Sequence, residues 1–159
     1  MIEVTIAPDE TREEVWELYQ QYAEELAQFY EDKDRRTAHY DACFDEYWEE
    51  SSRTPFLIIY DHELIGFCFL TNTGTRYMID ELYIKPVQRG REFGRYAVEC
   101  VLDYCREQAR HNTVGANVQV GNTGAVAFWK SLGFHDTGRR TRIAHQRLIE
   151  TEADLASKR

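Results

Sequence analysis

The residues best placed for chemistry lie in a turn near the middle of the chain. The sequence reads QRGREFG over 88–94, and Pro86 ends the preceding strand because its nitrogen has no hydrogen to donate. Successive backbone N–H groups at the start of a helix bind anions, and Gly90 and Gly94 let a ligand approach closely. Positive charge comes from Arg89, Arg91 and Arg95. The turn predicts a phosphate site, although it matches neither a P-loop nor a dinucleotide fingerprint. The alternative is a connecting turn with exposed arginines.

Two adjacent carboxylates, Asp80 and Glu81, lie in the strand YMIDELYI that leads into this turn. Successive side chains of a regular strand point to opposite faces, so we expect at most one of them to face a bound ligand. A carboxylate in that position can take a proton as a general base. The alternative is that both lie at a strand edge or in salt bridges.

No other group of residues predicts a nucleophile or a metal site. The cysteines lack metal-ligand spacing, and we expect free thiols without a disulfide framework. The histidines have no nucleophile pattern near them. The cysteines are Cys43, Cys68, Cys100 and Cys105, and the histidines considered are His39, His62, His111 and His135, four of the five in the chain.

The elements that must position the turn and the carboxylates follow from hydrophobic periodicity and turn residues. The predicted order is a strand at 2–7, helices at 8–30 and 37–50, a hairpin at 55–74, a strand at 76–84, a helix at 90–110, a strand at 114–120, a helix at 122–134 and closing strands within 139–150. Gly66 is expected to mark a bulge in the hairpin. This order predicts one mixed α/β domain over 1–150 with helices on both faces of the sheet, followed by a tail at 151–159.

Composition and charge narrow the class of protein. The chain has 159 residues, of which 43% are hydrophobic and 30% charged, which is typical of a globular domain. It has no apolar run of membrane-spanning length and no signal peptide, so we expect a cytoplasmic protein without a membrane partner. The net charge of −9 argues against nucleic-acid binding.

The charge is also unevenly distributed. Residues 1–50 hold sixteen acidic and four basic side chains, a net of −12, whereas 51–159 hold twelve and fifteen, a net of +3. The acidic half is either a set of solvated helix faces or a wall facing a cationic substrate, with the basic half facing an anionic cofactor.

A second segment, VQVGNTGAVAFWKSLGF, strengthens the interpretation of the turn. Together the two segments resemble the GNAT superfamily of acyl-CoA N-acyltransferases. That family has Arg/Gln-x-x-Gly-x-Gly/Ala after a strand, then Asn-x-x-Ala, an aromatic residue seven positions after the Asn, and Gly-Phe. The matching positions are Arg89 to Gly94, then Asn122, Ala125, Trp129, Gly133 and Phe134. The resemblance covers 77–134 by motif and implies a mostly antiparallel central sheet.

The resemblance implies that acetyl-CoA is the co-substrate. Its pyrophosphate is expected on the turn 89–94, with Phe93 among the binding residues and Arg95 beside it. Its pantetheine arm is expected to pair with the backbone of Leu82, Tyr83 and Ile84, and Asn122 to flank the arm. Acyl transfer needs a neutral amine, so one of the two strand carboxylates would be the base, and we favour Glu81 over Asp80.

Two positions depart from the family pattern. Glu92 replaces the first motif glycine, which puts a negative charge near the proposed pyrophosphate or simply stabilises the first turn of the helix. Trp129 replaces a tyrosine proposed to protonate the leaving thiolate. An indole N–H cannot act as a titrating acid, so Trp129 is either a packing residue or a cofactor contact, and no general acid is predicted.

The prediction is therefore an acetyl-CoA-dependent N-acetyltransferase. We expect the acceptor to be a small cationic primary amine, such as a polyamine or an aminoglycoside. Many members of the family are dimers, so the resemblance allows a homodimer, but the sequence does not fix the oligomeric state. The alternatives are a protein N-terminal or lysine acetyltransferase, and a CoA-binding or ligand-sensing domain with little catalysis.

Overall fold

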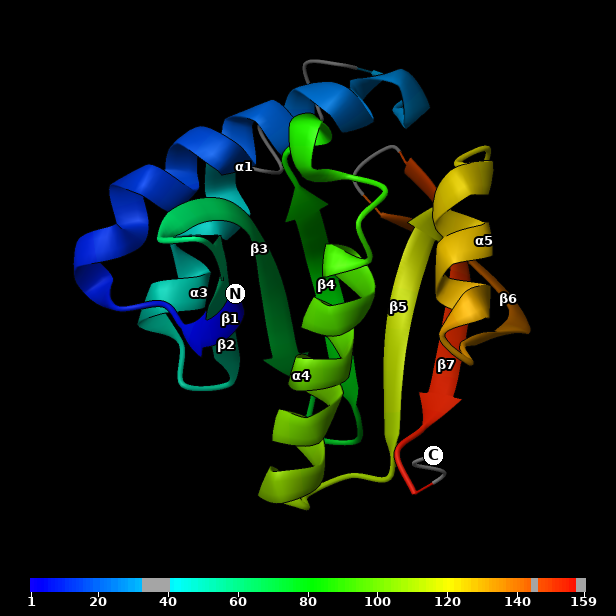
Figure 1. Ribbon diagram of the computed structural model, residues 1–159. Coiled ribbons are helices and arrows are strands. Elements are labelled where there is room, and N and C mark those ends of the chain that lie inside the picture. The colour runs from blue at the N-terminus through cyan, green and yellow to red at the C-terminus, as the bar shows by residue number, and fades with distance from the viewer. Residues whose placement is uncertain (33–40, 144–145, 157–159) are drawn as a thin grey trace.

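The computed structural model describes residues 1–32, 41–143 and 146–156 (Figure 1). Its strands are β1 (Ile2–Ile6), β2 (Arg53–Tyr60), β3 (Glu63–Asn72), β4 (Tyr77–Ile84), β5 (Thr113–Gln119), β6 (His135–Ile143) and β7 (Gln146–Asp154). Its helices are α1 (Arg12–Leu26), α3 (Glu46–Glu49), α4 (Phe93–Gln108) and α5 (Thr123–Ser131), with 3-10 turns η1 (Asp9–Thr11), η2 (Ala27–Phe29) and η3 (Pro86–Gln88). The predicted order of elements is confirmed for these residues. The first part of the helix predicted at 37–50 lies outside them.

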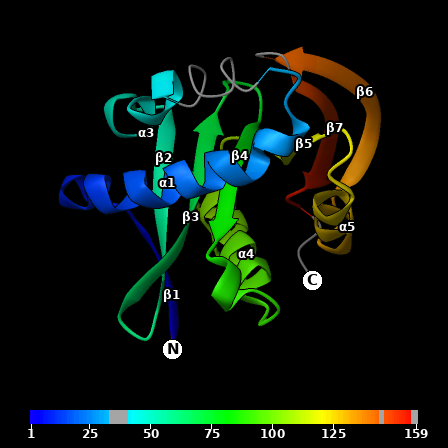
Figure 2. The same cartoon turned by 90° about the horizontal axis from the view of Figure 1, so that it is seen from above.

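The strands form one seven-stranded sheet in the order β1-β2-β3-β4-β5-β7-β6. All neighbours are antiparallel except β4 and β5, which confirms the mostly antiparallel prediction. Helices α4 and α5 cover one face, around Val98, Val101 and Trp129. Helices α1 and α3 cover the other, around Tyr19 and Tyr47. Figure 2 shows α3 and α4 on opposite sides of the strands.

The β2–β3 hairpin contains the bulge that Gly66 predicts. Ile58 pairs with Gly66 and Ile59 with Leu64, so Ile65 is the extra residue. A Cβ atom on Gly66 would lie 2.1 Å from the backbone oxygen of Tyr83. Glycine is therefore required here because the neighbouring strand β4 approaches too closely for any side chain.

Strand β4 has a second bulge, which corrects one prediction. Phe69 pairs with Glu81 and Leu70 with Ile79, so Asp80 is inserted between two paired residues. The insertion breaks the alternation of side chains. Asp80 and Glu81 consequently both face the α1 and α3 side of the sheet, and the expectation that they point to opposite faces is wrong.

Strands β4 and β5 separate beyond their first residues. Their parallel ladder joins Tyr77–Ile79 to Val114–Ala116, and among the described residues it extends no further. The two strands diverge toward their C-terminal ends (Figure 1). The sheet therefore opens into a gap next to the two carboxylates.

The C-terminal strand is longer than predicted. β7 pairs with β5 as far as Asp154, and Thr151, Ala153 and Leu155 are buried. Alternate residues of this strand face the core. Residues 151–154, predicted to begin the tail, therefore belong to the sheet.

Candidate functional site

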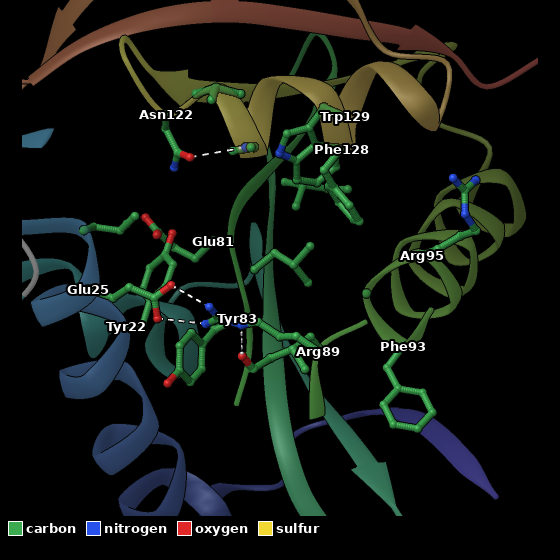
Figure 3. Close-up of a pocket in the computed structure, with 18 of the residues that line it drawn as sticks. Tyr22, Glu25, Glu81, Tyr83, Arg89, Phe93, Arg95, Asn122, Phe128 and Trp129 are labelled. Atoms are coloured by element: carbon green, nitrogen blue, oxygen red, sulfur yellow. Dashed lines mark hydrogen bonds and ion pairs between the residues drawn. The ribbon is translucent and has the colours of Figure 1, made fainter. Parts of the chain in front are cut away.

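A cavity of about 630 Å³ occupies the gap between β4 and β5. Its walls come from α1, from β4 and β5, from the turn at 88–95 and from α5 (Figure 3). A volume of this size is ample for a small-molecule site. The cavity brings together every predicted site residue except Arg91, namely Asp80, Glu81, Leu82, Tyr83, Ile84, Arg89, Gly90, Glu92, Phe93, Gly94, Arg95, Asn122 and Trp129.

One wall of the cavity offers free backbone groups. Because β4 leaves β5 after Ile79, the edge of residues 80–84 that faces the gap is without a ladder partner among the described residues. A strand edge of this kind can pair with an extended ligand through alternating N–H and C=O groups. The carbonyl of Ile84 is partly engaged, since it accepts a hydrogen bond of 2.8 Å from Nε of Arg89.

The turn presents the start of α4 to the cavity. α4 begins at Phe93, so the N–H groups of its first turn have no partner within the helix. Glu92 is the N-cap residue in the left-handed conformation, with φ 66°, and not a residue of the first helical turn as predicted. This backbone conformation suits glycine best. Gly90 also has positive φ, at 79°, so the turn uses two left-handed residues to direct its N–H groups.

The three arginines of the turn have different partners. Arg89 binds both carboxylate oxygens of Glu25 on α1, at 2.7 and 2.8 Å, and lies over the ring of Tyr83 (Figure 3). Arg95 bridges Glu92, at 2.9 Å, and the hydroxyl of Ser131 at the end of α5, at 3.1 Å.

Arg91 lies apart from the other two. It contacts the rings of Tyr60 and Phe93 and donates to the Tyr60 hydroxyl at 2.9 Å. These contacts hold its guanidinium outside the cavity lining, which is why one of the three charges of the turn is missing there.

The α1 side of the cavity carries the carboxylate Glu81 (Figure 3). The pKa of Glu81 is raised to about 8, mainly by burial and also by the neighbouring charge of Asp80. A hydrogen bond from Tyr22 opposes both effects. A group that titrates near neutral pH is suited to accept and release protons at a catalytic site.

Helix α5 forms the opposite wall. Asn122 caps this helix, because its side-chain oxygen accepts from the N–H of Ala125 at 3.2 Å. Trp129 is 7% exposed and packs edge-on against Phe134, with ring centroids 4.9 Å apart. The packing interpretation of Trp129 therefore has direct support, while a part of the residue still reaches the cavity.

Sequence reasoning missed two residues of the α1 wall. The helical spacing of Tyr22 with its apolar neighbours predicts a core residue, and Glu25 belongs to no motif, yet both line the cavity. Their spacing of three places them on one face of α1. A carboxylate on the otherwise apolar side of the helix was the only signal in the sequence that could have pointed to them.

Two further features, a metal-binding cluster and a membrane-spanning helix, are absent from the described residues. Within 1–32, 41–143 and 146–156, His, Cys, Asp and Glu side chains form no group able to hold a metal ion. Over the same ranges, the structure has no helix with the length and apolarity needed to span a membrane. The four cysteines are free thiols, as predicted.

Comparison with known proteins identifies the family that these features resemble. Residues 12–134 match the model of the acetyltransferase (GNAT) family. The match spans the cavity from α1 to the end of α5. No curated protein matches the sequence.

Solved structures share the fold at low sequence identity. The N-acetyltransferase PaiA of Thermoplasma acidophilum, in complex with coenzyme A, superposes with a TM-score of 0.77 at 14% identity, over 94% of this chain and 98% of that one. Spermidine N-acetyltransferase of Vibrio cholerae, in complex with CoA and spermine, gives 0.72 at 16% identity, over 98% and 96%. A ribosomal-protein alanine N-acetyltransferase of Escherichia coli gives 0.67 at 13%, over 98% and 94%.

Proposed function

Because the chain belongs to the acetyltransferase (GNAT) family, we propose that it acetylates a primary amine of a small, positively charged acceptor, such as a polyamine or an aminoglycoside. The chain is an acetyl-CoA-dependent N-acetyltransferase, with acetyl-CoA as its co-substrate. The acceptor and the roles of individual residues are what the proposal adds. A cytoplasmic location and a homodimer remain predictions from the sequence.

The cavity has suitable partners for each part of acetyl-CoA. We place the pantetheine arm along the free edge of Leu82–Ile84, where its amides can pair with the strand. The pyrophosphate then reaches the first turn of α4, whose N–H groups and dipole favour an anion. Asn122 and Trp129 flank the arm from α5. This arrangement directs the thioester toward the α1 side, where Glu81 lies.

The reaction needs a base because the acceptor is an ammonium ion in water. An alkyl ammonium with a pKa near ~10.4 is only about 0.04% neutral at pH 7. Glu81 takes one proton of the ammonium, and the amine nitrogen attacks the thioester carbonyl carbon. The C–S bond then breaks, the coenzyme leaves as a thiolate, and the second proton of the attacking nitrogen is released to the thiolate or to water. A thiolate of pKa near ~8.5 can leave without a general acid, which fits a tryptophan at position 129.

The observation that carries the proposal is the half-buried Glu81, which lines the cavity and has a pKa of about 8. A bound ammonium lowers that pKa again, because an opposite charge favours the carboxylate. Asp80 and Glu25 also line the cavity, so this side carries three carboxylates, of which Glu25 is paired with Arg89. An acidic wall favours a cationic acceptor, and the Vibrio cholerae neighbour was crystallised with the polyamine spermine.

Two alternatives have some support. The Escherichia coli neighbour is named for acetylation of a protein alanine, which supports a peptide as the alternative acceptor. Glu92 and Trp129, at positions where the family favours glycine and tyrosine, fit a domain that binds CoA with little catalysis.

The test is an acceptor panel with purified protein. Spermidine, an aminoglycoside, a peptide with a free N-terminal alanine and an N-terminally blocked lysine peptide are each incubated with acetyl-CoA. Free CoA is quantified by chromatography, since thiol reagents would also label the four cysteines, and the acetylated product is identified by mass spectrometry. We expect kcat/KM for the polyamine or aminoglycoside to exceed that of both peptides by at least about tenfold. A preference for a peptide, or CoA binding without any product, would reject the proposed acceptor class.

A further inference from the structure

The bulge in β4 places two carboxylates side by side on one face of the sheet. Asp80 is the inserted residue, and Glu81 follows it in the ladder with β3. In a regular strand the two side chains would be separated by the sheet. A bulge that brings like charges together costs free energy. Such an arrangement points to a functional effect of Asp80 on Glu81.

Asp80 is held by residues from three other elements. Its Oδ2 accepts a hydrogen bond of 2.7 Å from the hydroxyl of Tyr47 on α3, and another from the hydroxyl of Thr71 on β3. The guanidinium of Arg53 on β2 lies 4.0 Å from the same oxygen. The pKa of Asp80 is raised overall, because burial outweighs the two hydroxyls and the arginine, which lower it. These three partners favour the charged form of Asp80 and hold its carboxylate in place.

Glu81 has a different environment. Among the residues that the structure describes, no arginine or lysine shifts the pKa of Glu81, and its hydroxyl donor is Tyr22 on α1. The other titratable groups that act on the pair are Tyr19 on α1, Tyr47 on α3, Cys43 before α3, and Cys68 on β3. Burial raises the pKa of each of these four, which keeps them neutral where Glu81 titrates. Within the described part of the chain, Asp80 is therefore the one charged group that shifts the pKa of Glu81, and Tyr22 is its hydrogen-bond donor.

We propose that Asp80 is a positioning residue for Glu81: an anchored negative charge which, together with the Tyr22 hydroxyl, sets the pH at which Glu81 gains and loses its proton. The proposal rests on the role of Glu81 in the proposed function. It assigns the base role to Glu81 and an anchored, supporting role to Asp80, whose Oδ2 accepts two hydroxyl donors. It also accounts for the β4 bulge, because the bulge places the Asp80 side chain on the same face of the sheet as Glu81.

The two neighbours act in opposite directions, which makes the proposal testable. Asp80→Asn removes the repulsion but keeps an oxygen that can accept from Tyr47 and Thr71. The charged form of Glu81 then becomes easier to form, and its titration midpoint falls by about one pH unit. Tyr22→Phe removes a donor to the charged form, so the midpoint rises, by roughly half a unit to one unit.

The experiment follows Glu81 itself without a ligand. Protein labelled with ¹³C at glutamate carboxyls is titrated by NMR, and the Glu81 signal is assigned by its loss in Glu81→Gln. We expect a midpoint near 8 in the wild type, a lower one in Asp80→Asn and a higher one in Tyr22→Phe. An unchanged or raised midpoint in Asp80→Asn, or an unchanged one in Tyr22→Phe, overturns the proposal. If Asp80→Asn does not fold, Asp80→Ser removes the same charge and should also lower the Glu81 midpoint; no decrease would then overturn the proposal.

A parallel pH–rate measurement separates this proposal from the proposed function. The acid limb of kcat should move in the same directions as the NMR midpoints. If the midpoints move and the acid limb does not, Asp80 and Tyr22 do set the titration of Glu81, but Glu81 is not the base.

Discussion

Glu92 offers a quantitative test of the phosphate site. Its carboxylate lies at the start of α4, is 77% exposed and pairs with Arg95 at 2.9 Å. The substitution Glu92→Gln removes the charge and leaves the backbone and the chain length nearly unchanged. Gln cannot hold Arg95 as an ion pair, so that arginine is also released toward the cavity.

The expected gain follows from Coulomb's law. A carboxylate about 6 Å from the pyrophosphate, in the high effective dielectric of an exposed site, about 40–80, repels one unit charge by roughly 0.7–1.4 kcal/mol. That range corresponds to an affinity for CoA about 3–10-fold tighter in the variant. The ion pair with Arg95 already offsets part of the repulsion, which favours the lower part of this range.

The assay is calorimetric titration of CoA at low and at physiological salt. The gain should shrink as salt rises, because exposed charges are screened. Glu107→Gln, an exposed glutamate near the far end of α4, is the matched control and should leave the affinity unchanged. Glu92→Gly should bind at least as tightly as Glu92→Gln, because it also relieves the left-handed conformation. Unchanged or weaker CoA binding in Glu92→Gln, in a folded protein, would refute the placement of the pyrophosphate on this turn.

Four further predictions follow from the same geometry. Gly94→Glu should weaken CoA binding at least about tenfold in a folded protein, because the new side chain enters the cavity beside the turn; calorimetry would show it, and an unchanged affinity would count against the site. Gly66→Ala should lower the free energy of unfolding by at least about 2 kcal/mol in urea melts, because its Cβ would overlap a backbone oxygen of β4, and a neutral effect would contradict the close approach. Glu25→Gln should tighten CoA binding about two- to fivefold by freeing Arg89, whereas weaker binding would mean that the pair helps to build the site. Glu81→Gln should raise the melting temperature at pH 9 more than at pH 5: the pKa of Glu81 is raised in the fold, so stability is lost in the wild type as pH rises from its unfolded value of 4.5 through about 8, and equal effects at both pH values would contradict that shift.

The sequence predicted the order of elements because each has a strong local signal. Alternating apolar residues marked the strands, helical spacing marked α1 and α4, and Pro86 marked the end of a strand. The residues of the cavity were largely predicted too, because they lie in two compact motifs at 77–95 and 122–134. Such motifs keep their residues together in space whatever the rest of the chain does.

The wrong or missed predictions share a physical cause. Each concerns a feature that depends on contacts between segments and not on the local sequence. The β4 bulge depends on how β3 and β4 align, so the shared face of Asp80 and Glu81 was not visible in either strand alone. The left-handed conformation of Glu92 is set by the turn as a whole and not by the preference of glutamate. Tyr22 joins the site only because α1 packs across the sheet beside β4.

The base role of Glu81 is tested most directly by the pH–rate profile of Glu81→Gln with an acceptor from the panel. We expect kcat at pH 7 to fall by about 10²–10⁴, the usual effect of losing a general base, with little change in CoA affinity. The defect should shrink as pH rises, because solution then supplies the neutral amine. The control Glu107→Gln should behave as the wild type. A profile for Glu81→Gln that matches the wild type in height and shape would contradict general-base catalysis by this residue.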